Sequence, residues 1–353
     1  MAHEFADHGG GHKRFLTGRL PAEPVGFVND APCVGSIVAK LRERRSVGVP
    51  NYVAGADNGR TGVDVFSFGA AYLGSAYAPF IVGGDPSSPE FKVQNLSLAP
   101  EMETRLDHRV QLLGGFDRLR REVDKSGAMD AMDSFNRRAI ELLMSDKARN
   151  AFDLSQEDAP VRERYGMHAY GQRALMARRL VEAGCSFVTM VMENPLPSKP
   201  LPEGVIYNWD SHAVNGHIFD DARVRFPLYD QAVTALVEDL YARGLDKKVL
   251  LVVTGEFGRT PRISTVNGRP GRDHWPNAMS MFVCGGGMRT GQAIGSTNPK
   301  GEHPQDRPLS PNDLWATVYR HLGIDYETAF PDHDGRPMPI LPFGAPISEL
   351  LPA

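Results

Sequence analysis

The sequence predicts an α/β fold with parallel strands. The main observation is a unit of helix, glycine and strand that occurs twice in succession. Repetition of this unit is typical of parallel strands joined by helical crossovers. The two units comprise a helix over 168–183, Gly184 and a strand over 186–192, followed by a helix over 226–240, Gly244 and a strand over 248–253.

Shorter patterns assign the other segments. Apolar residues over 34–45 have helical spacing, whereas the rest of 21–100 is rich in proline and glycine and is predicted to form long loops. The first dozen residues are dense in glycine and histidine, which favours a functional loop. The remaining predicted elements are helices over 101–123 and 128–151, a strand over 279–284, and a helix over 311–322 that Asn312 or Asp313 caps.

The length allows two average domains or one large α/β domain, and we expect one domain over residues 1–353, with a helical insertion around 101–154. The 353 residues, 41% of them hydrophobic, are enough to bury a sizeable core. No segment has the composition of a linker that would divide the chain. The three cysteines have no CxxC spacing, which argues against a disulfide framework or a thiolate zinc site. We expect Cys185 and Cys284, which stand beside apolar runs, to be buried.

Charge and hydropathy narrow the classes of partner. The net charge of −4 and the pI near 6.3 give no electrostatic support for a nucleic-acid partner, so a small molecule is the better expectation. No stretch approaches the roughly 20 apolar residues of a membrane span. The first residues also lack the apolar segment of a secretory signal.

Three short stretches in the C-terminal half place acidic and histidine residues on predicted loops. They cover 208–212, 254–261 and 271–276, and the middle one directly follows the predicted strand over 248–253. Loops at strand ends are where α/β proteins place their chemistry. Carboxylate and imidazole ligands suit a divalent cation such as Zn²⁺, Mn²⁺, Mg²⁺ or Ca²⁺. The sequence therefore predicts a metal site with the ligands Asp210, His212, Glu256, Asp273 and His274.

Each stretch also has a simpler interpretation. Asp210 would cap a turn and leave His212 exposed, and Glu256 would interact with a helix N-terminus or with Arg259. Asp273 and His274 in a tight loop are a weak signal by themselves. Three such stretches at or near strand ends nevertheless favour a shared site over three unrelated loops.

Two arginines, Arg259 and Arg272, lie in the same stretches. A guanidinium beside a metal is suited to a bidentate grip on phosphate or sulfate. An ordinary ion pair with Glu256 or Asp273 explains the two arginines equally well. The glycines over 285–287 lack the Lys-Ser/Thr ending of a P-loop and are predicted to form a turn.

Several of these stretches together resemble the DUF1501 family of bacterial proteins. The resemblance rests on WDSH, VVTGEFGRTPR, GRDHWP, MSMFVCGGG and PNDLWATVYRHLG, and continues upstream through LTGRLP, YVAGAD, YLGSAYAPF and LMARRLVEAGCSFV, so it covers nearly the whole chain. That family in turn resembles the sulfatase and alkaline phosphatase superfamily. The resemblance implies a mostly parallel sheet between helices and the hydrolysis of phosphate or sulfate esters at a pair of divalent metals.

The resemblance also implies roles for individual residues. Asp210 and His212, joined by His274, would hold one metal. Glu256 stands where the superfamily has an Asp-His pair, and Phe257 replaces that histidine, which weakens the case for a second metal. The superfamily nucleophile, a Ser, Thr or modified Cys at a helix N-terminus, falls on His8.

A histidine at that position would be a phosphoryl acceptor, a metal ligand, or a sign that the ester-cleaving machinery is lost. The resemblance implies that His8 or His12 acts as nucleophile or general acid/base, while Arg259 steadies the anionic centre. Relatives also carry an upstream strand with another metal-binding Asp, preceded by an export signal. We therefore expect the chain to be an N-terminally truncated form of a longer, commonly exported protein.

The function expected on these grounds is a metal-dependent hydrolase of a small or carbohydrate-linked sulfate or phosphate ester. The alternative is a non-catalytic binding protein that keeps the fold and one structural metal. The missing nucleophile and Phe257 favour this alternative, whereas the clustered ionisable residues favour the enzyme. A mutase or transferase on the same fold is a third interpretation that no residue singles out.

Overall fold

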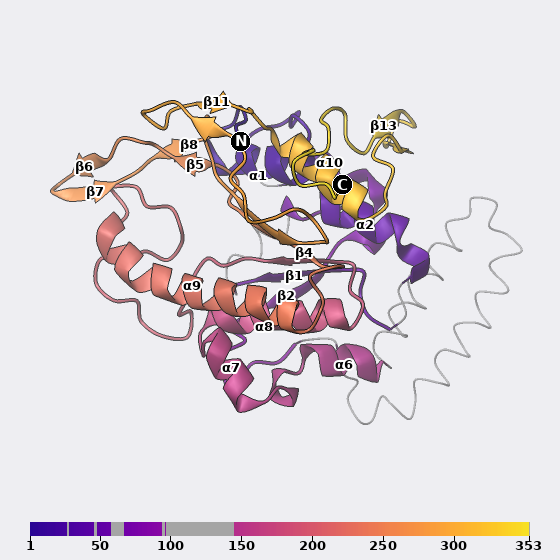
Figure 1. The fold of residues 1–353 in the computed structure, drawn as a ribbon, viewed down its shortest axis with the longest axis horizontal. Coiled ribbons are helices and arrows are strands. Elements are labelled where there is room, and N and C mark those ends of the chain that lie inside the picture. The colour runs from indigo at the N-terminus through magenta and orange to yellow at the C-terminus, as the bar shows by residue number, and fades with distance from the viewer. Residues whose placement is uncertain (27, 46–47, 58–66, 94–95, 97–144, 353) are drawn as a thin grey trace, which may run out of the picture.

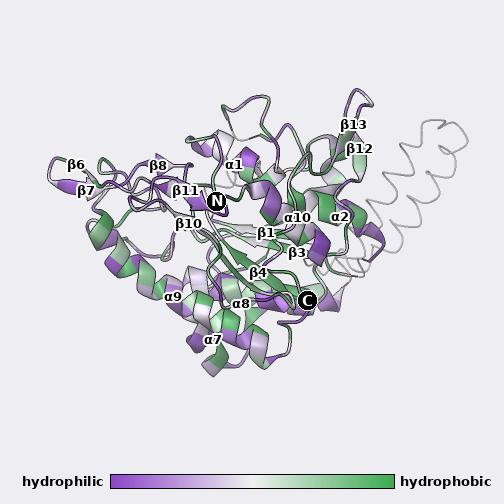
Figure 2. Cartoon of the chain, turned by 45° about the horizontal axis from the view of Figure 1, so that its top comes forward, coloured by the Kyte–Doolittle hydropathy of each residue, from purple (hydrophilic) through white to green (hydrophobic). Residues whose placement is uncertain are grey.

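The computed structural model describes residues 1–26, 28–45, 48–57, 67–93, 96 and 145–352. Within them the chain forms a mixed α/β structure, with strands between two layers of helices (Figure 1). Hydrophobic residues gather on the strands in the middle of the molecule, between the helices (Figure 2). No helix in the described ranges combines the length and the apolar character that crossing a membrane requires.

The central sheet has three parallel strands in the order β2-β1-β3. They are β1 (Tyr52–Ala56), β2 (Phe80–Gly83) and β3 (Phe187–Met190). Val53 lies opposite Phe80 on one side and Val188 on the other. All five residues of β1 are buried, as expected for a parallel strand with helices on both faces.

The prediction of long loops over 21–100 was wrong for β1 and β2. Both strands are short apolar runs that carry glycine, so they show neither alternation nor helical spacing. A Cβ atom on Gly55 would lie 2.4 Å from the Met190 sulfur. A side chain at Gly55 would force the Met190 side chain to shift, so the glycine that weakens the strand pattern eases the packing of β3 against β1.

A second pair of strands continues the apolar layer. β4 (Leu250–Val253) and β9 (Phe282–Gly285) match the strands predicted over 248–253 and 279–284. They run antiparallel, so the expected parallel order applies only to the three-stranded sheet. Among the described strands, β4 pairs only with β9, and β3 pairs only with β1. The fold class is therefore mixed α/β.

Four of the described helices pack on one face of the strands: α6 (Asp146–Phe152), α7 (Ala159–Tyr165), α8 (Ala169–Glu182) and α9 (Ile218–Ala242). Leu175 and Leu180 of α8 and Leu236 of α9 are buried in one cluster with Val53 of β1. Val188 and Leu251 pack against the same cluster. This face therefore buries side chains from both strand groups.

On the other face lie three helices of the described ranges: α1 (His8–Thr17), α2 (Val34–Leu41) and α10 (Pro311–His321). Phe15, Ile37 and Trp315 form the centre of their cluster, against which Leu250 and Val252 pack. Alternate residues of β4 thus face opposite helical layers, which is the arrangement of a strand buried on both faces.

The glycines predicted to end two helices are confirmed, but the second of these helices, α9, begins at Ile218 and not at 226. Gly184 (φ 94°) and Gly244 (φ 66°) directly follow the caps of α8 and α9, where left-handed backbone favours glycine. Ser310, rather than Asn312 or Asp313, is the N-cap of α10. Asp313 completes a capping box with Ser310, while Asn312 is buried and accepts a hydrogen bond from Arg14.

Residues 101–144 of the predicted helical insertion lie outside the described residues, and the part that is described begins with α6. The predicted helix over 34–45 is α2 followed by a 3-10 turn. The remaining short elements are the 3-10 turns η1 (Glu43–Arg45), η2 (Ala71–Leu73), η3 (Ser75–Tyr77) and η4 (Leu154–Gln156) and the strand pairs β5 (Gly258–Arg259) with β8 (His274–Trp275), β6 (Ser264–Val266) with β7 (Arg269–Gly271), β10 (Ser296–Thr297) with β11 (Pro304–Asp306), and β12 (Ala329–Pro331) with β13 (Pro337–Pro339).

Candidate functional site

The strand pair β5 and β8 places two of the predicted site residues side by side. Arg259 lies directly opposite His274, so their side chains leave the same face of the pair. The Thr260 N–H donates to the Asp273 carbonyl and extends the pairing by one residue. Figure 1 shows this pair next to α1 and the N-terminus.

The loop that carries Asp210 and His212 lies against the same hairpin. The Arg272 N–H donates to the Ser211 carbonyl over 2.8 Å. A Cβ atom on Gly271 would lie 2.0 Å from the Ala213 nitrogen, so only glycine permits this backbone approach. The sequence at 271 therefore determines how closely the loop and the hairpin can approach.

Arg225 of α9 fixes the loop from the other side. Its guanidinium is fully buried and donates to the carbonyl oxygens of Ile206 and Asn208, at 2.7 and 2.9 Å. It also forms two hydrogen bonds with Asp221, one helical turn earlier. The segment just before Asp210 is thus attached to a rigid helix.

The first dozen residues do not form the predicted loop, because α1 begins at His8. Asp7 is the N-cap and accepts a hydrogen bond from the Gly10 N–H over 2.8 Å. Three successive glycines normally disfavour a helix. Here a Cβ atom on Gly9 would lie 2.6 Å from the Gly26 carbonyl oxygen, and one on Gly11 would lie 2.9 Å from the Phe257 ring. Close packing of α1 therefore explains the glycines.

Asp210, His212 and His274 converge on one point. The Asp210 Oδ1 atom is 2.9 Å from His212 Nε2 and 2.8 Å from His274 Nε2, and the two Nε2 atoms are 3.0 Å apart. Ligand atoms around a four-coordinate zinc ion, with bonds of about 2.0–2.1 Å, lie about 3.3 Å apart. The three atoms therefore have nearly the spacing of a ligand set.

The hydrogen-bond partners of the two Nδ1 atoms determine whether each Nε2 atom carries a proton or a lone pair. His212 Nδ1 lies 2.6 Å from Asp273 Oδ1, and His274 Nδ1 lies 2.5 Å from the Ala6 carbonyl oxygen. Both partners only accept hydrogen bonds, so each Nδ1 carries the proton of the neutral ring. Each Nε2 then has a lone pair directed at the other and at the Asp210 carboxylate. Three acceptors that face one another require a cation or additional protons between them.

A second group forms on α1 and the loop after β4. His8 and His12 are four residues apart and share one face of the helix. Glu256 Oε1 is 2.7 Å from His8 Nδ1 and 3.5 Å from His12 Nε2. On the other side of its ring, His8 Nε2 is 3.5 Å from Asp210 Oδ1. His8 therefore lies between the two groups, and either set of three can hold a metal ion (His8, Asp210 and His274, or His8, His12 and Glu256).

Contacts within the two groups strongly shift the pKa values of His8, Asp210 and Glu256. Hydrogen bonds to Asp210 and then to Glu256 raise the pKa of His8 to about 9. Burial, the largest effect on Asp210, raises its pKa, but the contacts with His274, His8 and Arg259 outweigh it and hold that pKa far below its ordinary value. Burial likewise raises the pKa of Glu256, yet the charge and hydrogen bond of His12, together with His8, lower it overall.

The two arginines differ in their roles. Arg259 pairs with Asp210, with Nη1 2.8 Å from Oδ1, instead of with the expected Glu256. Arg272 donates to the backbone carbonyls of Thr260 and Arg259 and so supports the hairpin. Of these two arginines, Arg259 is therefore the one that places its guanidinium in the cluster.

The structure brings seven of the eight predicted site residues into one partly exposed cluster. Their side chains are 16–33% exposed, which leaves them accessible to a small ligand (His8, His12, Asp210, His212, Glu256, Arg259 and His274). Asp273 instead stands behind His212 and is 54% exposed.

Two contributors were not predicted. His3 is buried and its Nε2 lies 2.5 Å from the Glu256 carbonyl oxygen, which attaches the N-terminal segment to the loop after β4. The Ala6 carbonyl orients His274. Neither contact could be predicted from the sequence. Every residue has a backbone carbonyl, so residue identity does not mark Ala6, and a single histidine such as His3 is too common to indicate a site.

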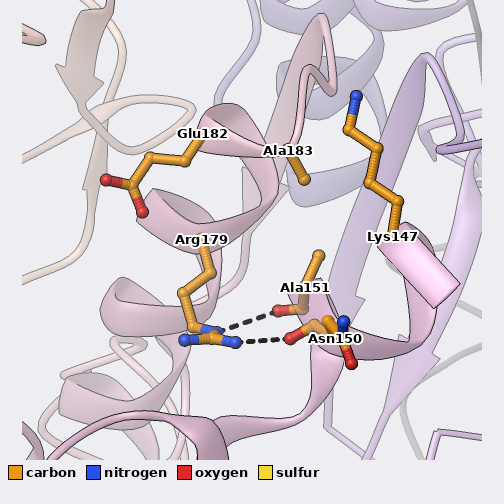
Figure 3. Close-up of a pocket in the computed structure, with 6 residues that line it drawn as sticks. All are labelled: Lys147, Asn150, Ala151, Arg179, Glu182 and Ala183. Atoms are coloured by element: carbon orange, nitrogen blue, oxygen red, sulfur yellow. Dashed lines mark hydrogen bonds between the residues drawn. The ribbon is translucent and has the colours of Figure 1, made fainter.

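A surface pocket of about 300 Å³ lies elsewhere and shares no residue with the cluster. Arg179 of α8 donates there to the carbonyl oxygens of Ala151 and Asn150 of α6 (Figure 3). These contacts hold two helices together. The pocket lining includes neither histidine nor aspartate.

Comparison with known proteins gives one match. The family described as "Protein of unknown function (DUF1501)" matches residues 1–351. No curated protein and no solved structure matches the chain.

Proposed function

The chain belongs to the DUF1501 family, and from its candidate site we propose that it is a metal-dependent hydrolase of phosphate or sulfate esters. The observation that carries the proposal is the convergence of Asp210, His212 and His274, whose acceptor atoms face one another at 2.8–3.0 Å beside the guanidinium of Arg259. Such a site combines a place for a cation with a place for an anion.

The donor set fits a divalent cation. One carboxylate oxygen and two imidazole nitrogens suit Zn²⁺ or Mn²⁺ better than Ca²⁺, which prefers oxygen ligands throughout. When bound, such a cation polarises an ester oxygen and lowers the pKa of a water molecule. Asp273 and the Ala6 carbonyl hold the two histidines in the tautomers that ligation needs.

The substrate class follows from the positive groups beside these ligands. The Arg259 guanidinium is 19% exposed and can exchange its contact with Asp210 for one with a phosphate or sulfate oxygen. The N-terminus of α1, which also favours anions, begins at His8 in the same cluster. A small or carbohydrate-linked anionic ester is therefore the expected substrate.

We expect water to be the attacking group. Position 8 has no hydroxyl or thiol, and both nitrogens of the His8 ring face carboxylates, at 2.7 Å to Glu256 and 3.5 Å to Asp210. No lone pair of that ring is directed toward a substrate. His8 and His12 can instead carry protons or bind a cation.

We further propose that the family is related to the sulfatase and alkaline phosphatase superfamily. Parallel strands between helical layers and acidic and histidine side chains on loops support this placement. The antiparallel pair of β4 and β9 is a departure from a mostly parallel sheet.

The second candidate function is a non-catalytic binding protein. It is favoured by His8 at the position where the superfamily has a nucleophile and by Phe257, whose ring packs 4.3 Å from that of His274. Such a protein would bind a cation and an anion without turning the ester over.

Elemental analysis of protein purified without chelator tests the proposal, alongside an Asp210→Ala, His274→Ala double variant and a His333→Gln control on the exposed β12–β13 turn. We expect metal in the first and third proteins only. The same three proteins are then assayed with p-nitrophenyl phosphate, p-nitrophenyl sulfate, a sugar phosphate and a sugar sulfate. Metal without turnover would favour the binding protein, and absence of metal from all three would reject the hydrolase.

A further inference from the structure

The two ring nitrogens of His8 face two different sets of ligand atoms. Nδ1 lies 2.7 Å from Glu256 Oε1, which His12 Nε2 also approaches at 3.5 Å. Nε2 lies 3.5 Å from Asp210 Oδ1, to which His274 Nε2 is also directed at 2.8 Å. The two nitrogens of an imidazole point away from each other, so one ring cannot direct both lone pairs at a single ion.

Each of the two sets can hold a cation of its own. The ligand atoms of His8, Asp210 and His274 all lie within 4.8 Å of one another, and so do those of His8, His12 and Glu256. Imidazole and carboxylate are common ligands of zinc and manganese. His8 is the one residue that both sets share.

We propose that His8 is a bridging ligand, whose imidazole joins two divalent cations, one at Asp210 and His274 and the other at His12 and Glu256. This inference rests on the proposed function and gives His8 a ligand role in place of a proton-transfer role. On binding, each nitrogen releases its N–H proton to solvent and donates a lone pair to one cation. No electron is transferred.

The surroundings of His8 fix the orientation that a bridge requires. Its ring lies 5.3 Å from the Phe257 ring and 4.5 Å from the His274 ring. The Asp7 cap determines where α1 begins, and the close approach at Gly11 brings the helix to Phe257. These contacts on two sides favour the orientation in which each nitrogen of the ring faces a different set.

Metal stoichiometry is the first test. Chelator-stripped protein is titrated with Zn²⁺ alone, and bound metal is measured after gel filtration. We expect two ions per chain in the wild type and in the His333→Gln control. We expect one ion in His12→Gln, and at most one, bound more weakly, in His8→Ala. Free imidazole added to His8→Ala should restore part of the lost binding, which a folding defect would not allow.

Copper shows whether the two ions share one ring. Unpaired electrons of two Cu²⁺ ions couple through an imidazolate bridge, so the doubly loaded wild type should give much less electron paramagnetic resonance intensity than two isolated ions. His8→Ala loaded with copper should give the full intensity of every ion that it binds. Circular dichroism of both variants checks that the fold is retained.

The outcomes separate the bridge from the hydrolase. Either of two results would overturn the bridge without contradicting the hydrolase. One is full signal intensity from two Cu²⁺ ions in the wild type. The other is a single ion that His8→Ala binds as tightly as the wild type does. Absence of bound metal from every protein would overturn both. Two coupled ions without any ester hydrolysis would support the bridge and reject the hydrolase.

Discussion

Asp273 contacts His212 on the side of the ring that faces away from Asp210, with its Oδ1 atom 2.6 Å from Nδ1. The sequence predicted Asp273 as a ligand, but its carboxylate does not face the point where Asp210, His212 and His274 converge. We infer that it orients His212 and fixes the tautomer of its ring.

Asp273→Asn should weaken binding of the cation at Asp210 about 10- to 100-fold, because loss of such an outer partner typically has that effect. Zinc affinity measured by competition with a chelator checks this, with Asp306→Asn on exposed β11 as the control. His212→Ala should be more damaging, because it removes a ligand. Equal losses in the two variants would show that Asp273 itself binds the ion.

Gly271→Ala should separate the loop of His212 from the hairpin of His274. The new methyl group would meet the Ala213 backbone nitrogen at 2.0 Å, and backbone cannot move aside as a side chain can. Overpacking of this kind costs about 1–3 kcal/mol, and we expect the upper end. Urea unfolding and zinc affinity should both decline.

Gly255→Ala is the matched control for this substitution. Its methyl group would meet nothing closer than the Phe257 carbonyl oxygen at 3.6 Å, an ordinary contact. The control should keep wild-type stability to within about 0.5 kcal/mol. Equal effects of the two alanines would contradict the role assigned to the close approach at Gly271.

Arg225→Lys should destabilise the protein by about 1–3 kcal/mol, because a lysine ammonium cannot reproduce the fork that satisfies the buried carbonyls of Ile206 and Asn208. Arg223→Lys, two residues away on the same helix and 75% exposed, should be nearly neutral. Denaturant unfolding compares the two. If they behave alike, Arg225 does not anchor the segment before Asp210.

The metal-free protein should lose stability as the pH rises from about 6.5 through 9. The pKa of His8 is raised to about 9 in the folded protein, against about 6.5 in an unfolded chain. Protonation of His8 therefore stabilises the fold fully below about pH 6.5, and this contribution is lost as the pH rises through about 9. Asp210 and Glu256 have lowered pKa values and act oppositely: they stabilise the fold above about pH 4, and acidification removes that contribution.

Urea unfolding at a series of pH values in the presence of chelator measures this dependence. In His8→Gln the decline between pH 6.5 and 9 should be much smaller, while His333→Gln should retain it. A wild-type stability that does not change over this range would mean that His8 is not held by the two carboxylates.

The sequence predicts those site residues that directly follow a strand or that occur as pairs of acidic and histidine residues. Glu256 follows β4 directly, and the paired residues at 210 and 212 and at 273 and 274 stand out because acidic and histidine residues occur together. The structure brings these stretches together, and their role as ligands stays a prediction. The orientation of Asp273 could not be predicted, because residue identity does not say which side of a ring a carboxylate approaches.

The N-terminal half was predicted less well for a physical reason. Local patterns report propensity, and the glycines of α1 and β1 have poor propensity for the elements they form. A side chain at Gly11 or Gly55 would force Phe257 or Met190 to shift, so the packing at these two positions favours glycine. Such contacts are set by residues far away in sequence, which a local pattern does not contain. The 168–253 region was predicted better because its apolar spacing is regular.

The meeting of three distant segments at one point has a thermodynamic consequence. His8 and Glu256, which are in contact, are 248 residues apart in sequence, and His212 and Asp273 are 61 apart. A cation held there would act as a cross-link that closes long loops, so part of the folding free energy would depend on the free cation concentration. By mass action this contribution grows with the logarithm of that concentration, to about 4 kcal/mol at a thousand times the dissociation constant. The melting temperature would then report how much cation the surroundings supply.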